Sequence, residues 1–172
     1  MNKPTIKFTK FKPNAIIPTK EYHNAGYDIY PCFEKDFIII KSHETVLIPT
    51  GIGSVLPTEY YFQIQERGST GSKGIKYSAG VIDSSYRGEW FLAVTNTNAK
   101  PVVIAKPDVI EDLDSLLLPT FESDYILYPY DKALFQAILH KVEDVNVEEI
   151  DLEEFITYTT ERGDGCLGSS NK

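Results

Sequence analysis

The close spacing of proline and glycine between short apolar runs constrains the fold of this chain most strongly. Residues 5–11 (TIKFTKF) and 61–65 (YFQIQ) alternate apolar and polar side chains with period two, which is typical of half-buried β-strands. Residues 36–41, 44–50 and 90–96 are short runs rich in β-branched and aromatic residues. Because turn residues recur about every 8–12 positions, the sequence predicts an all-β sandwich, jelly roll or barrel.

Size, composition and charge limit the classes of function. The 172 residues suffice for one domain with its own core, and contents of 42% apolar and 24% charged residues are ordinary for a globular protein. The formal net charge of −8 argues against nucleic-acid binding, which needs a basic face to neutralise phosphates. A small anionic ligand is still possible where positive charge is concentrated locally.

No segment predicts export or membrane insertion. No stretch reaches the length of a membrane span, and residues 1–11 alternate charged and apolar residues instead of forming a signal peptide. Cys32 and Cys166 are too few and too far apart to indicate a disulfide framework or a metal cluster. We therefore expect a cytoplasmic protein in a reducing environment.

Two segments depart from the strand pattern. We interpret residues 98–130 as a mixed insertion between strands, in which one or two helical turns would place Leu113, Leu116 and Leu117 on one side before strand character resumes. Residues 142–155 are acidic, and we expect a solvated loop or an edge strand there.

Arginine and glycine occur together in this chain. The three arginines, Arg67, Arg87 and Arg162, are each followed by glycine, and eight of the 11 glycines lie in or beside the same segments. Lysines, in contrast, are scattered. Glycine lets backbone N–H groups approach an oxyanion, and arginine adds a permanently charged fork of donors. The pattern predicts a phosphate-binding site built from several loops, although glycine is also common in the turns of ordinary β-proteins.

The first of these segments, residues 66–74 (ERGSTGSKG), has only a superficial likeness to a P-loop. The P-loop spacing is not met, and no apolar helix follows the segment. A Walker-type NTPase is therefore not indicated.

Residues 79–90 (AGVIDSSYRGEW) point to a different chemistry. Asp83 follows the apolar pair Val81 and Ile82, so it leaves a strand near a hairpin, where its carboxylate could take a proton from water. Tyr86 could stack against a sugar or a base. Taken alone, an aspartate and a tyrosine in a turn are more often structural than catalytic.

Five segments, in order along almost the whole chain, resemble the five motifs of the trimeric dUTP diphosphatases (dUTPases). They are AGYDIY (25–30), ERGSTGSKG (66–74), GVIDSSYRGE (80–89), ALFQAIL (133–139) and RGDGCLGSS (162–170). The third is highly specific. The resemblance implies a distorted jelly-roll or β-clip type barrel that hydrolyses dUTP to dUMP and pyrophosphate, which keeps uracil out of DNA and supplies dUMP.

The resemblance implies roles for individual residues. Asp83 matches the carboxylate that activates the water attacking the α-phosphorus, and Tyr86 matches the aromatic residue that packs under deoxyribose. Asp28 matches a carboxylate that orients waters around a phosphate-bound Mg²⁺, so Mg²⁺ is the implied cofactor. The other matched positions bind substrate: Gly80, Val81 and Ile82 read uracil, while Arg67, Gly68, Ser69, Gln136, Arg162 and Ser169 bind phosphates.

Some positions depart from the family pattern. Gly68 stands where the family has serine, and a serine follows one residue later. In the fifth motif, Leu167 replaces the aromatic residue that covers uracil, and Cys166 replaces a glycine. Ala133 stands where the fourth motif usually has arginine or lysine, and Lys132 is one position away. We expect an active enzyme with a lowered rate.

The resemblance also implies an assembly and a domain plan. Each active site of the family draws on three subunits, which implies a homotrimer. Residues 1–160 would form one β-domain, and residues 161–172 a mobile C-terminal arm that closes over the nucleotide. The insertion at 98–130 resembles those of phage-encoded dUTPases, some of which bind repressors. The alternative function is therefore a regulatory protein on a dUTPase scaffold, with this insertion as its partner surface.

Two further alternatives have weaker support. The dCTP deaminases share the fold and resemble this chain around residues 82–88, but their catalytic glutamate corresponds to Ala93 here. The Arg-Gly-Asp tripeptide at 162–164 matches an adhesion motif. No secretion signal accompanies it, and three-residue motifs recur by chance.

Overall fold

The computed structural model describes residues 3–117 and 124–164. Its contacts divide the chain into two compact units, Met1–Val142 and Glu143–Lys172. Within the described residues, all strands lie in the first unit, and the second contains one short helix, α3 (Leu152–Phe155). The prediction of an all-β protein is confirmed, while the expected arm at 161–172 stays a prediction.

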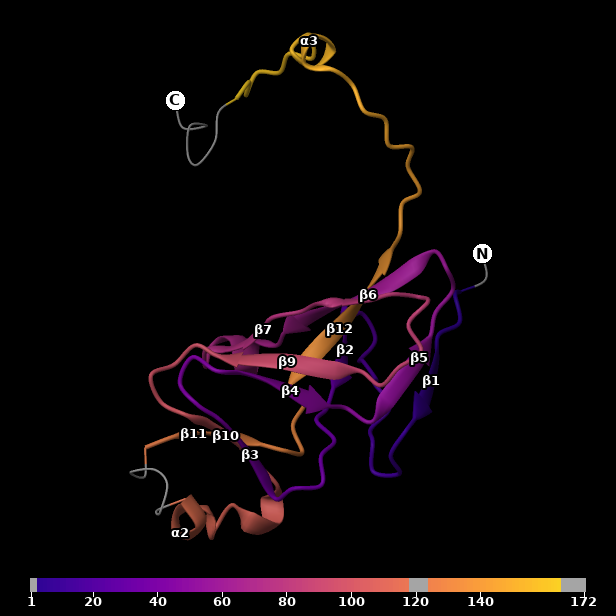
Figure 1. Ribbon diagram of the computed structural model, residues 1–172. Coiled ribbons are helices and arrows are strands. Elements are labelled where there is room, and N and C mark those ends of the chain that lie inside the picture. Colours follow the sequence, from indigo (N-terminus) through magenta and orange to yellow (C-terminus); the bar gives the residue numbers. More distant parts are fainter. Residues whose placement is uncertain (1–2, 118–123, 165–172) are drawn as a thin grey trace. The chain divides into compact units, whose positions relative to one another are not determined.

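The described strands form four small sheets. Figure 1 labels most of these strands on the ribbon, which is coloured along the sequence. The strands expected near residues 5–11, 36–41, 44–50, 61–65 and 90–96 are all present. The sheets, each in spatial order, are β1 (Lys7–Lys10) and β5 (Ile52–Val55); β11 (Ile126–Pro129), β10 (Val102–Ala105) and β3 (Phe37–Ile40); β2 (Gly26–Ile29), β12 (Phe135–Lys141), β6 (Tyr60–Glu66) and β8 (Val81–Ile82); and β4 (Thr45–Pro49), β9 (Phe91–Asn96) and β7 (Ile75–Tyr77).

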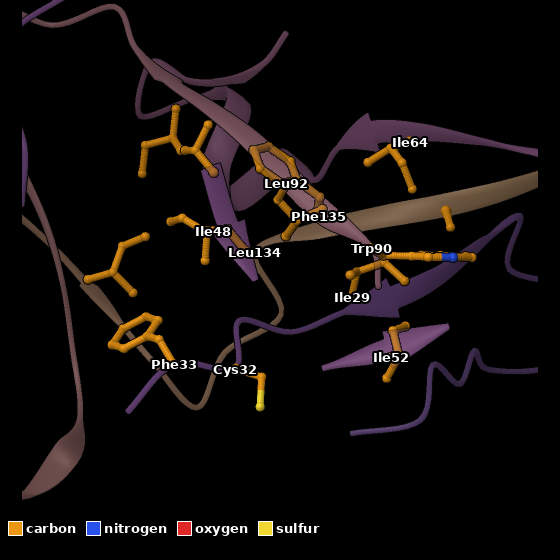
Figure 2. Close-up of a cluster of buried hydrophobic side chains, with 14 of the residues drawn as sticks. Ile29, Cys32, Phe33, Ile48, Ile52, Ile64, Trp90, Leu92, Leu134 and Phe135 are labelled. Carbon is orange, nitrogen blue, oxygen red and sulfur yellow. The ribbon is translucent and has the colours of Figure 1, made fainter. Parts of the chain in front are cut away.

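The main core forms because alternate residues of these strands point inward. On β6, Phe62 and Ile64 are buried, while the side chains between and after them face outward. The rings of Phe8, Phe62 and Trp90 pack together, with Phe62 and Trp90 edge to face at 5.4 Å between centroids. Figure 2 shows Trp90 beside Ile29 and Ile52 in this core. Burying each such side chain contributes about 1.5–3 kcal/mol.

A second, smaller core lies on the other face of the β11–β10–β3 sheet. Val102 and Ile104 belong to the main core, whereas Val103 and Ala105 pack against α2 (Leu113–Leu117). The segment 98–130 thus supplies two strands, the 3₁₀ turn η1 (Pro107–Val109) and the helix that covers this sheet.

The expectation that three leucines share one side of this helix was wrong in one position. Leu113 and Leu117 are buried, but Leu116 is 48% exposed. Successive helical residues are about 100° apart, so the sheet that covers Leu117 leaves Leu116 outside.

The acidic segment after β12 is mostly a solvated loop. Residues 143–150 form no helix or strand, and all are exposed. The short helix α3 was not predicted; it starts where the Asp151 carboxylate accepts a hydrogen bond from the Glu154 N–H at 2.8 Å. None of the described helices has the length and apolar character to cross a membrane.

Candidate active site

Eight of the residues identified from the sequence line two cavities of the first unit: Asp28, Arg67 and Gln136 line one, and Gly80, Val81, Ile82, Asp83 and Tyr86 line the other. We name them the arginine cavity, of about 470 Å³, and the hairpin cavity, of about 280 Å³. They share no lining residue. The arginine cavity is lined by Thr19, Lys20, Glu21, Asn24, Ala25, Gly26, Asp28, Tyr30, Arg67 and Gln136. The hairpin cavity is lined by Tyr77, Ala79, Gly80, Val81, Ile82, Asp83, Tyr86 and Phe91.

Arg67 is fixed in the arginine cavity by three contacts. Its Nε and Nη2 atoms lie 3.0 Å and 3.3 Å from the two carboxylate oxygens of Asp28, and its Nη1 donates to the Ala133 carbonyl at 3.2 Å. Both charged side chains keep one third of their surface exposed to the cavity. The guanidinium is therefore oriented before any ligand arrives, as a phosphate-binding arginine requires.

Gln136 lies beside this pair because of strand register. It is opposite Asp28 in the β2–β12 pairing, and its Nε2 donates to the Glu66 carbonyl at 2.8 Å. The side chain occupies space that only a glycine at position 26 leaves open. A Cβ on Gly26 would lie 2.2 Å from Gln136 Oε1 and 2.8 Å from Gln136 Cβ.

Gly26 is not among the site residues expected from the sequence. A glycine inside a strand is the signal that could have pointed to it, because such a residue often marks close approach by another group.

Gly68 and Ser69 follow Arg67 in the single-turn helix α1 (Gly68–Gly71), and both are exposed. The turn is held by Thr70, whose hydroxyl accepts a hydrogen bond from the Arg67 N–H at 3.1 Å. Neither Gly68 nor Ser69 lines the arginine cavity. The structure therefore brings Asp28, Arg67 and Gln136 together and leaves these two at the surface nearby.

The hairpin cavity is built on β8, as the sequence predicted. The Gly80 carbonyl accepts a hydrogen bond from the Ile64 N–H at 2.7 Å, which fixes the hairpin on β6. Asp83 directly follows β8 and is exposed. Its carbonyl accepts from the Tyr86 N–H at 3.1 Å, so a tight turn joins the carboxylate and the ring. A water molecule could reach this carboxylate.

Tyr86 is held at the rim of the cavity by its own turn. Its hydroxyl donates to the Glu89 carbonyl at 2.9 Å, and the ring lies over Gly88, where a Cβ would meet the hydroxyl oxygen at 2.4 Å. Arg87 closes the turn from outside by donating to the carbonyls of Ser84 and Tyr86. The ring is 43% exposed and can receive a flat or cyclic ligand group.

Tyr77 and Phe91 also line the hairpin cavity, and the sequence analysis did not identify them. Burial raises the pKa of the Tyr77 hydroxyl to about 12. The Glu66 carboxylate accepts a hydrogen bond from the Tyr77 N–H at 3.0 Å. Burial alone would raise the pKa of Glu66, but backbone hydrogen bonds from Tyr77 and from Glu66 itself, with the nearby Lys76 charge, lower it below the usual value.

Strand order keeps Asp83 of the hairpin cavity away from Asp28 and Arg67 of the arginine cavity within one chain. Asp28 lies on β2 at one edge of its sheet and Ile82 on β8 at the other, three strand spacings or about 14 Å away. Ile82 pairs with Phe62, so the antiparallel register puts Asp83 level with Tyr61. Arg67 lies six residues beyond Tyr61, directly after the end of β6, which is roughly 20 Å further at the rise of a strand.

Comparisons with known proteins identify the family. A family model for dUTPase matches residues 12–112. The deoxyuridine 5′-triphosphate nucleotidohydrolase of Candida albicans is 30% identical to this chain. The match covers 98% of this chain and 89% of the Candida protein. The enzyme of that name from Leptospira interrogans is 32% identical over 69% of this chain and 82% of its length. This chain belongs to the dUTPase family.

Solved dUTPase structures share the fold. The Staphylococcus bacteriophage 80alpha dUTPase with dUPNHPP superposes with a TM-score of 0.71, at 18% identity over 98% of this chain and 99% of that one. The EIAV dUTPase gives a TM-score of 0.60, at 17% identity over 86% and 98%. The predicted jelly-roll architecture is confirmed.

The fifth dUTPase motif lies in the second unit. Arg162 is within the described residues, whereas Cys166, Leu167 and Ser169 lie outside them. The roles expected for these four positions remain predictions.

The residues of the arginine cavity fit a Mg²⁺ ion held mainly by substrate phosphates. The described residues contain no group of three or more His, Cys, Asp or Glu side chains able to hold a metal by themselves. A phosphate-bound Mg²⁺ keeps several waters and needs few protein ligands. The Asp28 oxygens, although bonded to Arg67, each retain a lone pair that could accept from such a water.

Proposed function

We propose that this protein hydrolyses dUTP to dUMP and pyrophosphate. Membership of the dUTPase family supports the reaction. The observation that carries the proposal is the hairpin cavity, where β8 ends at an exposed Asp83 and the Tyr86 ring lies one turn away. An acid–base group and a sugar-sized platform therefore face the same cavity.

In the proposed reaction, Asp83 takes a proton from a water molecule while the oxygen of that water attacks the α-phosphorus. The bond between this phosphorus and the bridging oxygen to the β-phosphorus breaks, and pyrophosphate leaves. Backbone groups of Gly80, Val81 and Ile82 read uracil, and Tyr86 packs against deoxyribose, where a 2′-hydroxyl would collide with the ring. Positioning of this kind, with general-base catalysis, supplies most of what phosphoryl transfer needs.

The arginine cavity supplies the phosphate site of the proposal. Arg67 and Gln136 would bind phosphate oxygens, and Gly68 and Ser69 would contribute from the adjoining turn. When bound, Mg²⁺ would neutralise charge on the phosphates, and Asp28 would hold its waters. The polar lining and the oriented Arg67 fork support this assignment.

The distance between Asp83 and Arg67 supports an active site that uses two or more protomers, and membership of the dUTPase family supports a homotrimer. Asp83 and Arg67 are too far apart in one chain to act on one triphosphate. A second copy could place its hairpin cavity against the arginine cavity of the first, and cyclic symmetry would repeat this contact. The C-terminal arm at 161–172, with Arg162, Leu167 and Ser169, would close over the nucleotide and exclude water.

A regulatory role is the second candidate function. The structure of the 80alpha dUTPase is described in terms of phage dUTPases that control transfer of virulence genes by a G protein-like mechanism. In the present chain, α2 covers one sheet face and leaves Leu116 exposed beside acidic residues. The segment 98–130 could therefore bind a protein regulator, with or without catalysis. For either candidate function, we propose a cytoplasmic location.

A pyrophosphate-release assay tests the function. Wild-type protein with Mg²⁺ should release pyrophosphate from dUTP and far less from dTTP, dCTP or UTP, and chelation of Mg²⁺ should abolish release. Equal turnover of UTP would contradict the role of Tyr86. No turnover of any nucleotide would leave only the regulatory candidate.

A further inference from the structure

The arginine cavity lacks the cation that the fourth dUTPase motif usually supplies. Ala133 occupies that position and is only 3% exposed. Its carbonyl accepts hydrogen bonds from Arg67 and from the Tyr128 hydroxyl, at 3.2 Å and 2.6 Å. The position supports Arg67 through its backbone but adds no charge. Lys132, one residue earlier, is exposed and does not line the cavity.

Lys20 lines the same cavity from the loop before β2. The carbonyl of the preceding residue, Thr19, accepts a hydrogen bond from the Asp28 N–H at 2.8 Å, which ties the start of the loop to the strand that carries Asp28. The Lys20 ammonium donates to the Asn24 carbonyl at 2.5 Å and lies 5.5 Å from the centre of the Tyr27 ring. These contacts restrict an otherwise flexible side chain.

Charge and hydrogen-bonding capacity both leave Lys20 able to bind an anion. Asp28 already balances the charge of Arg67 through the forked pair, and Glu21 adds one further negative charge to the cavity lining. Among the described residues, Lys20 forms no ion pair with a carboxylate. An ammonium group has three N–H donors, and the Asn24 carbonyl uses one of them.

We infer that Lys20 is a phosphate-binding residue and supplies the second cation of the arginine cavity. This inference rests on the proposed function and adds to it a substrate-binding residue outside the five family motifs. In this chain the loop at 19–25 replaces the charge missing at Ala133. Lys20 binds the triphosphate through its positive charge. It therefore raises the affinity for dUTP more than the affinity for dUMP.

Calorimetric titration of full-length protein with dUMP and with dUpNHpp, the ligand in the 80alpha dUTPase structure, tests the inference. Lys20→Met keeps most of the apolar stem but removes the charge, and it should weaken dUpNHpp binding about 3- to 10-fold, as expected for one partly exposed charge contact. Binding of dUMP should change less than about twofold. Lys20→Arg should bind like wild type, and so should the control Lys132→Met.

Wild-type affinity for dUpNHpp in Lys20→Met would overturn the inference and leave the proposed function intact. Equal losses for dUpNHpp and dUMP would also overturn it, because the phosphates that Lys20 is inferred to bind are absent from dUMP. A wild-type protein that neither binds dUpNHpp nor hydrolyses dUTP would overturn the proposed function and this inference together. Thermal unfolding of each variant separates a lost contact from a lost fold.

Discussion

Arg67, directly after β6, contacts both carboxylate oxygens of Asp28, on β2, through its Nε and Nη2 atoms at 3.0 Å and 3.3 Å. The pair joins two strands that are not neighbours in the sheet, since β12 lies between them. It fixes the direction of the remaining arginine donors in the absence of a ligand. Less side-chain entropy is then lost when phosphate binds.

Arg67→Lys should lower kcat/KM for dUTP about 10- to 100-fold, because an ammonium cannot reproduce the two-point contact. Steady-state kinetics measures the change. Lys100→Gln is the matched control: it removes a more exposed ion pair, with Asp124, and should leave the kinetics unchanged. Wild-type kinetics in Arg67→Lys would show that the fork has no function in phosphate binding.

Gly26→Ala should displace Gln136, because the new Cβ would overlap with it. We expect a loss of about 1–3 kcal/mol in unfolding free energy and a fall in kcat/KM close to that of Gln136→Ala. If Gly26 acts through Gln136, Gly26→Ala combined with Gln136→Gly, which also removes the Gln136 Cβ that would lie 2.8 Å away, should be no slower than Gln136→Gly alone. Fully additive losses in kcat/KM would instead assign Gly26 a separate role.

Gly68 tests the departure of the second motif from the family pattern. A Cβ at this position meets nothing within 4 Å, so Gly68→Ser and Gly68→Ala should both fold and unfold at or slightly above the wild-type temperature. If the family hydroxyl acts on the phosphates, only Gly68→Ser should raise kcat, by up to about tenfold. Equal kcat in the two variants would show that Ser69 already provides the contact or that none is needed.

Because Tyr77 is partly buried, we expect the protein to lose stability at alkaline pH. Burial raises the pKa of Tyr77 in the folded protein to about 12, above the ordinary tyrosine pKa of about 10, so the unfolded chain loses this proton first as pH rises. The contribution is therefore complete below pH 10 and is lost toward pH 12, at most about 2 kcal/mol. Urea unfolding at pH 8 to 11 should show a steeper decline for wild type than for Tyr77→Phe. Parallel declines would contradict the assignment.

The strands and the turn that carries Asp83 could be predicted because they depend on local patterns. Alternation in residues 61–65 places Phe62 and Ile64 inward, and the apolar pair before Asp83 marks the end of β8. Arg67 was identified through its glycine neighbour and the family motif. In each case, the signal lies within about ten residues of the chain.

The rest of the site depends on pairing between distant segments. The contact of Gly26 with Gln136 exists only in the β2–β12 register, and Lys20 reaches the arginine cavity only because its loop is bonded to Asp28. Leu116 was misplaced because its burial depends on how α2 rotates against the sheet. A single sequence does not reveal strand register, loop position or helix rotation, because these depend on contacts between distant segments.

Asp83→Asn should lower kcat about 10²- to 10⁴-fold while dUpNHpp still binds, because the amide keeps the shape of the side chain but cannot accept the water proton. Arg67→Ala should be inactive for a different reason, since it lacks a phosphate contact. Retained kcat in Asp83→Asn would place the base elsewhere.

Mixing these two inactive variants tests the shared active site most directly. In randomly reassembled trimers, about one quarter of the sites would combine an intact arginine cavity from one protomer with an intact Asp83 from another. We predict that equimolar mixing after subunit exchange restores about a quarter of wild-type pyrophosphate release from dUTP. Exchange that is verified by mass but restores no activity would contradict a site assembled between protomers.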